Sequence, residues 1–151
     1  MKKILLISMI CFLITPFIAR SQDGLDINKL FSAPFIDNDG VTYLNITGKQ
    51  LDTYGMSLYR SISVTENPEL STTVEQAVKH DGTSAISREV SFKYGKLYFG
   101  FYTLTPIKGI NRFILYLNLA TEEKPKTTLI YLEGKCDETT IKKLLNKKTD
   151  E

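Results

Sequence analysis

The sequence predicts an α+β fold in which an antiparallel sheet of about five to six strands carries two main helices packed on one face. The C-terminal half contains four β-type runs separated by short turn signals, at 85–94, 96–104, 111–119 and 126–133. Connections this short cannot make parallel crossovers, so the runs predict a four-strand antiparallel meander. Two further segments, 67–81 and 137–147, place apolar residues at helical spacing.

The residues before the helix at 67–81 are expected to supply the other strands of the sheet. Residues 23–31 are compatible with a short amphipathic helix or turn, and the Asp-Asn-Asp-Gly sequence at 37–40 signals a turn before a strand at 41–47. A short helical excursion is expected at 49–54. Residues 57–65 alternate between the two faces of a strand, which is typical of a half-buried strand.

The two main helices have recognisable starts. Asn67 can cap the first helix, Pro68 fits its first position, and Glu69 suits the positive end of its dipole. Gly82 is expected to end this helix. The last helix begins after Asp137, and its apolar stripe consists of Ile141, Leu144 and Leu145.

Residues 1–21 have the three parts of a cleaved signal peptide. Two lysines precede an apolar run at 4–18, and small residues then lead to a cleavage point between Ser21 and Gln22. Residues 22–151 are expected to form a single periplasmic or secreted α+β domain with no transmembrane segment. A retained membrane anchor is the alternative, but the run is shorter than the roughly 20 residues that a span needs.

Charge and cysteine content exclude several functions. Removal of the leader leaves 16 basic residues against 17 acidic ones, and a nearly neutral chain lacks the electrostatic footprint of a nucleic-acid-binding protein. Cys136 is the only cysteine after the leader, so no intrachain disulfide is possible and the fold depends on its core. The thiol is either a small buried residue or a reactive group at a helix start.

No catalytic residue, metal site or cofactor is predicted. His80 is the only histidine, no G-x-S-x-G pattern accompanies it, and a cation at a helix end explains it better than a triad does. One thiol and one histidine cannot build a zinc site. The turn at 37–40 fails as an EF-hand, because Phe35 and Ile46 stand where acidic ligands belong.

Arg60 is the most unusual polar residue, because it shares the apolar side of its strand with Leu58 and Ile62. An unpaired guanidinium would be costly there. Either Arg60 forms a structural ion pair with a carboxylate such as Glu89, or it lines a pocket and holds an anionic ligand.

The strand at 96–104 is aromatic on both faces. Strict alternation places Leu97 with Phe99 and Phe101 on the helix-covered face, and Tyr98 with Tyr102 on the other, partly wet face. Its Phe-Gly-Phe sequence resembles an RNA-binding submotif, but the flanking residues do not match it. The neighbouring strand contributes a further tyrosine to the expected binding face, Tyr116.

The sequences "LYRSISV", "GKLYFGFYTL", "NRFILYL" and "TLIYLEG", followed by a short closing helix, carry a resemblance. The chain resembles a family of small exported proteins of unknown function from gut-type Gram-negative bacteria. The resemblance implies export and an α+β fold, and it supplies no site residues.

These observations favour a non-enzymatic exported domain that binds an unknown protein or small molecule of the cell envelope through a tyrosine-bearing sheet face. One alternative is an envelope hydrolase that uses carboxylates such as Asp52, Glu75 or Glu89. Another is a structural or sensory accessory of a membrane partner. The sequence leaves the oligomeric state open.

Overall fold

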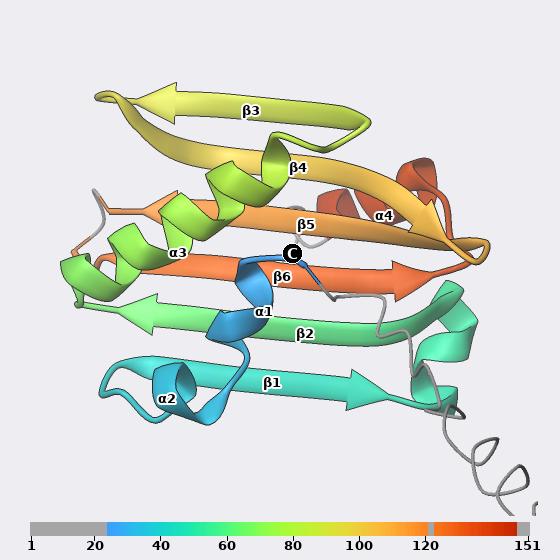
Figure 1. Cartoon of the computed structure of the whole chain (residues 1–151), viewed down its shortest axis with the longest axis horizontal. Helices are drawn as coiled ribbons and strands as arrows, with labels where there is room; N and C mark the ends of the chain where they lie inside the picture. The colour runs from blue at the N-terminus through green and yellow to red at the C-terminus, as the bar shows by residue number, and fades with distance from the viewer. Residues whose placement is uncertain (1–23, 121–122, 148–151) are drawn as a thin grey trace, which may run out of the picture.

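A computed structural model describes residues 24–120 and 123–147, and its central feature is one six-stranded antiparallel sheet (Figure 1). The strand order is β1-β2-β6-β5-β4-β3. The strands are β1 (Val41–Thr47), β2 (Met56–Thr65), β3 (Ser87–Lys93), β4 (Lys96–Ile107), β5 (Ile110–Leu119) and β6 (Lys126–Gly134). The α+β class and the antiparallel meander, now β3 to β6, are confirmed. The proposed leader, residues 1–21, lies outside the described residues.

Two tight hairpins set the order of the meander. The turn between β3 and β4 has positive φ at both Tyr94 (50°) and Gly95 (76°), and the turn between β4 and β5 repeats this at Lys108 (51°) and Gly109 (76°). Two consecutive left-handed residues define the turn whose twist matches that of paired strands. Each two-residue loop therefore folds its strand directly back onto its neighbour.

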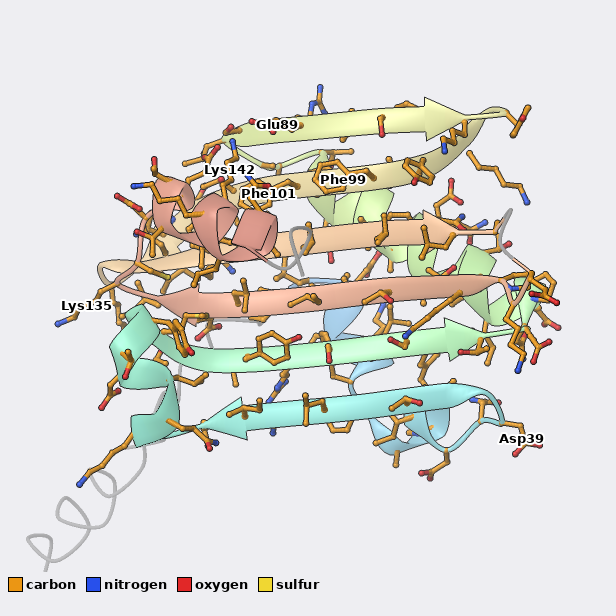
Figure 2. The ribbon with its side chains drawn as sticks, turned by 180° about the vertical axis from the view of Figure 1, so that it is seen from behind. Asp39, Glu89, Phe99, Phe101, Lys135 and Lys142 are labelled. Carbon is orange, nitrogen blue, oxygen red and sulfur yellow. The ribbon has the colours of Figure 1, made fainter. Side chains whose placement is uncertain are left out.

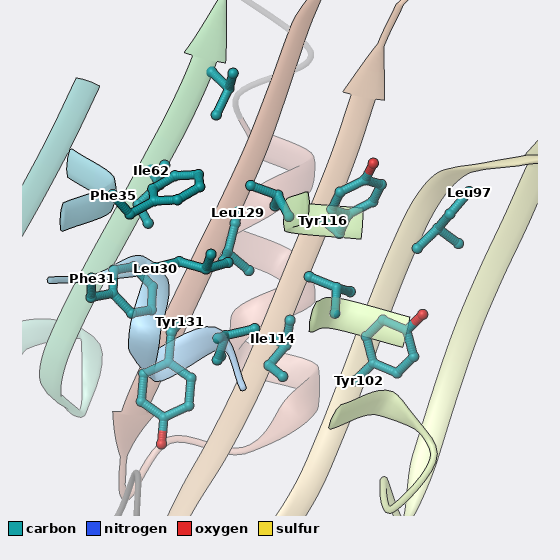
Figure 3. Close-up of a cluster of buried hydrophobic side chains, with 14 of the residues drawn as sticks. Leu30, Phe31, Phe35, Ile62, Leu97, Tyr102, Ile114, Tyr116, Leu129 and Tyr131 are labelled. Carbon is teal, nitrogen blue, oxygen red and sulfur yellow. The ribbon is translucent and has the colours of Figure 1, made fainter. Parts of the chain in front are cut away.

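Three helices cover one face of the sheet. The helix α3 (Pro68–Gly82) crosses this face diagonally and connects β2 to β3, while α1 (Ile27–Leu30) and α2 (Ala33–Ile36) lie beside it over β6, β2 and β1 (Figure 1). Asn67 caps α3 by accepting a hydrogen bond from the Leu70 N–H at 3.1 Å. The main core lies beneath these helices (Figure 3), and its sheet residues include Ile62, Leu97, Tyr102, Ile114, Tyr116, Leu129 and Tyr131.

The fourth helix, α4 (Glu138–Lys147), lies on the opposite face. Figure 2 shows α4 over one end of β4 and β5, with Phe101 beneath it. Its buried Ile141 packs in a second, smaller core formed by Phe101, Phe113, Leu115, Leu132 and Cys136. The prediction that both main helices pack on one face is therefore wrong. Both faces of the central strands are apolar, so the strand pattern could not show which face each helix covers.

A short 3-10 helix of six residues, η1 (Lys49–Tyr54), separates β1 from β2 and confirms the expected helical excursion. Across 24–120 and 123–147, the structure has no helix with the length and apolar character of a membrane span.

Candidate functional site

A β-bulge in β4 changes the two faces expected for this strand. Phe92 of β3 pairs with Leu97 and Ser91 pairs with Phe99, so Tyr98 is an extra residue with no partner in the register. Leu97 consequently joins the core under α3, and its expected place beside Phe99 is wrong. Tyr98 is half-buried, and the Lys93 Nζ lies 3.8 Å from its ring centroid.

Tyr102 and Tyr116, expected on a partly wet face, lie in the main core (Figure 3). They are 4% and 0% exposed, and burial raises the pKa of both phenols. The Tyr102 ring fills the space between Gly82 of α3 and Gly100 of β4. The expectation of an open tyrosine face is therefore wrong at these two positions, because α3 covers them.

Arg60 lies on the same covered face, between Asn45 of β1 and Tyr131 of β6 in the strand register. Its guanidinium carbon is 5.8 Å from the ring centroid of Phe31, a geometry that allows a cation–π contact. Glu89 lies on β3, at the far edge of the sheet, and contacts Lys142 of α4. The structural pair between Arg60 and Glu89 is thus not formed, and an anion-binding role for Arg60 stays a prediction.

The carboxylates considered for hydrolysis do not converge. Glu75 accepts a hydrogen bond from the Leu97 N–H at 3.2 Å on the α3 side, whereas Glu89 lies on the α4 side with Lys142. Asp52 is exposed on η1. Two carboxylates on opposite faces of a sheet cannot act on one bond.

A cluster at the end of α3, which sequence reasoning did not identify, fixes the N-terminal segment. The buried carboxylate of Asp81 accepts hydrogen bonds from the N–H groups of Asp26 (2.8 Å) and Ile27 (2.9 Å), and His80 Nδ1 lies 2.9 Å from Asp26 Oδ2. Oxygen and nitrogen atoms of Asp26, His80 and Asp81 lie close enough together to hold a cation. Both Asp81 oxygens already bind backbone N–H groups, so docking of α1 accounts for the arrangement.

Cys136 is 7% exposed in the smaller core, and burial raises the pKa of its thiol. A high pKa keeps the thiol protonated and poorly nucleophilic at neutral pH. The structure thus supports the small buried residue over the reactive thiol.

The candidate site is an apolar groove on the α4 face, between α4 and η1. Its volume is about 340 Å³, within the range of small-molecule sites. It is lined by Ile46, Leu51, Tyr54, Met56, Tyr59, Leu115, Ile130, Leu132, Ile141, Leu144 and Leu145. None of these side chains is charged, and the two tyrosines supply the only hydroxyl groups.

Backbone contacts hold the two walls of this groove together. The Cys136 N–H, just before α4, donates to the Gly55 carbonyl at the end of η1 over 3.0 Å. A Cβ on Gly134 would lie 2.3 Å from the same carbonyl oxygen, so this approach requires glycine.

Polar contacts fix the position of α4 on the sheet. Lys142 pairs with Glu138 (2.6 Å) and with Glu89 of β3, and Thr103 of β4 donates to Glu138 Oε2 at 2.8 Å. Asp137 Oδ1 caps the helix by accepting from the Thr140 N–H at 2.7 Å. The groove wall formed by α4 is therefore anchored independently of its apolar contacts.

The groove uses residues whose role the sequence did not reveal. The stripe of α4 predicts a buried helix face, but only Ile141 is buried, while Leu144 and Leu145 are half-buried in the groove. Tyr59 belongs to the polar-looking face of its strand, yet that face meets Leu132 of β6. The alternation of residues along β2 is the one sequence signal that points to the groove, because it predicts that Tyr59 and Ile62 lie on opposite faces of the sheet.

Neither the curated proteins nor the solved structures include a match to this chain. A family described as "Family of unknown function (DUF6108)" matches residues 14–145. That range includes every described element up to the last turn of α4. The expectation of a family of unknown function is confirmed, and the chain belongs to the family of unknown function DUF6108.

Proposed function

We propose that this protein is an exported, non-enzymatic module that binds an uncharged apolar chain in the groove between α4 and η1. The observation that carries the proposal is the lining, which joins apolar side chains from six elements without a charged group. Pockets of this kind bind by burial of apolar surface, with a few polar groups that orient the ligand. In this proposal, binding takes place in the groove on the α4 face and not on the opposite sheet face, where Tyr102 and Tyr116 lie.

The position of Tyr54 and Tyr59 supports a ligand with one polar end. Tyr54 is 45% exposed and Tyr59 is half-buried, so each can pack its ring against an apolar chain while its hydroxyl stays near water. A lipid-like acyl chain has this combination of a long apolar part and a polar end. We therefore infer acyl chains as the ligand class.

Export is part of the same proposal. It is supported by the signal-peptide pattern of residues 1–21, with cleavage between Ser21 and Gln22. The cell envelope is rich in acyl chains, which agrees with this ligand class. Fractionation of cells that express the full chain, with N-terminal sequencing of the product, tests the location and the cleavage point.

Binding is tested with a dansyl-labelled fatty acid, whose fluorescence rises in apolar surroundings. Leu144→Glu places a carboxylate in the groove and should weaken binding roughly tenfold or more, because a charge is costly to bury beside an apolar chain. Asn146→Glu is the matched control, since it adds the same charge to the exposed side of the same helix. Absence of probe binding, or equal binding by both variants, would contradict the proposal.

A further inference from the structure

The edge strand β3 is the most exposed apolar feature of the described residues. All seven of its residues are exposed, although β3 is as long as the other edge strand, β1, which is partly buried. Four of the six large exposed apolar residues lie on β3 or directly beside it: Ile86 (64%), Val90 (41%), Phe92 (56%) and Tyr94 (92%). An exposed apolar edge strand is a template for pairing with another strand.

The α3 side of this edge is also hollowed. A cavity of about 360 Å³ lies between β3 and α3, and Val90 and Phe92 line it together with Tyr102 and Gly82. Val90 and Phe92 share this face because alternate residues of a strand point the same way. A strand added to the edge would therefore cover apolar surface as well as pair its backbone.

We propose that the occupant of this edge is the β3 strand of a second copy of this chain, paired antiparallel about a two-fold axis at Ser91. Such a pairing is self-complementary, as a two-fold interface requires. It would join two six-stranded sheets into one continuous sheet.

The charges of Glu89 and Lys93 favour the register with its two-fold axis at Ser91. With Ser91 opposite Ser91 of the second copy, Glu89 faces Lys93 of the second copy, and Val90 faces Phe92 of the second copy. Each contact occurs twice by symmetry. Lys142 contacts Glu89 Oε1, which leaves Oε2 to accept from the lysine of the second copy. Opposite charges and apolar pairs are the cross-strand neighbours that stabilise a sheet.

The neighbouring two-fold registers are less favourable. An axis at Glu89 places two carboxylates opposite each other, and an axis at Val90 places Arg88 opposite Phe92. An axis at Phe92 removes Glu89 from Lys93 and places Ser91 opposite that lysine instead. Edge charges usually prevent strand pairing; here Glu89 and Lys93 select one register among these alternatives.

Charge reversal tests the pairing in protein purified from cells that express the full chain. Sedimentation velocity over a concentration series should show a monomer–dimer equilibrium. Lys93→Glu should raise the dissociation constant roughly tenfold or more, because it places like charges across the interface. The double variant Glu89→Lys with Lys93→Glu should restore the dimer. Lys96→Glu is the matched control on the adjacent strand, and thermal melts establish that each variant is folded.

Cross-linking tests the register itself. Ser91→Cys should form a disulfide-linked dimer under mild oxidation, because each copy places this residue beside its own equivalent. Ser87→Cys, on the same face of β3 but four residues from the axis, should remain monomeric on denaturing gels. A monomer at every concentration, a dimer indifferent to Lys93→Glu, or equal cross-linking at both positions would overturn the proposal.

Discussion

Gly82→Ala should destabilise this protein, although the same change within a helix normally stabilises it. Alanine gains about 0.5–1 kcal/mol over glycine in a helix. A Cβ at Gly82, however, would lie 2.4 Å from Cε1 and 2.8 Å from Cδ1 of Tyr102. The ring cannot retreat, because a Cβ built on Gly100 at its other edge would lie only 2.6 Å from Cε2.

Overpacking of this kind costs about 1–3 kcal/mol, and a trapped ring places the cost near the upper limit. The net loss should thus be about 2 kcal/mol, which corresponds to a decrease in Tm of roughly 6–10 °C for a domain of this size. Urea denaturation followed by circular dichroism measures the free energy of unfolding. Gln76→Ala, exposed on the same helix, should change it by less than about 0.5 kcal/mol.

A double-mutant cycle identifies the cause. In a Tyr102→Leu background the ring is absent, so Gly82→Ala should lose its cost, and the coupling energy should be about 1–3 kcal/mol. If Gly82→Ala is neutral or stabilising in the otherwise unchanged protein, Tyr102 does not fill this space and the assignment of a buried tyrosine face fails.

Two further predictions concern carboxylates. Asp81→Asn should lower the free energy of unfolding by about 1–3 kcal/mol, because one of the two backbone N–H groups, at Asp26 or Ile27, loses its acceptor. Hydrogen exchange at these two amides should accelerate. Unchanged exchange would argue against the role of Asp81 in docking α1. The hydrogen bond from Lys142 lowers the pKa of Glu138 in the folded protein. The stability that this shift contributes is therefore present above the unfolded pKa of about 4.3, and it is lost as the pH falls through the lower pKa of the folded state. Glu138→Gln should therefore reduce the loss of stability below pH ~4 in acid titrations of the melting temperature; an unaltered acid profile would refute this.

The local elements were predictable because their signals are local. The cap at Asn67, the stop at Gly82 and the short turns between the C-terminal strands act within a few residues of chain, and each is present as expected. The antiparallel meander follows from those turns. The pairing of β2 with β6 was not predictable, because it joins residues that are about 70 positions apart and share no turn.

The main error of the sequence-based prediction was the assignment of helices and side chains to the two faces of the sheet. Helix placement depends on which of two apolar strand faces each helix covers, and the strand pattern is the same for both outcomes. The bulge at Tyr98 then moved Leu97 to the face of Tyr102, a shift that depends on pairing with β3 and not on the composition of β4.

The candidate groove was hidden for a related reason. Leu144 and Leu145 read as buried residues of an amphipathic helix, and their half-exposure depends on how much of the sheet α4 is long enough to cover. The expected contact between Arg60 and Glu89 is not formed because Glu89 lies at the opposite edge of a six-stranded sheet. Both errors concern distances between elements, which a single sequence does not encode directly.

The strand order also has a consequence for synthesis. Among the strands that the structure describes, β6 is the last to leave the ribosome, yet it lies between β2 and β5 near the middle of the sheet. Until β6 is available, the β1–β2 pair and the β3–β5 meander share no strand, and β2 and β5 each have an open edge. The sheet is therefore completed only after β6 has been synthesised, and a product that stops before Lys126 leaves two incomplete sheets with edges prone to aggregation.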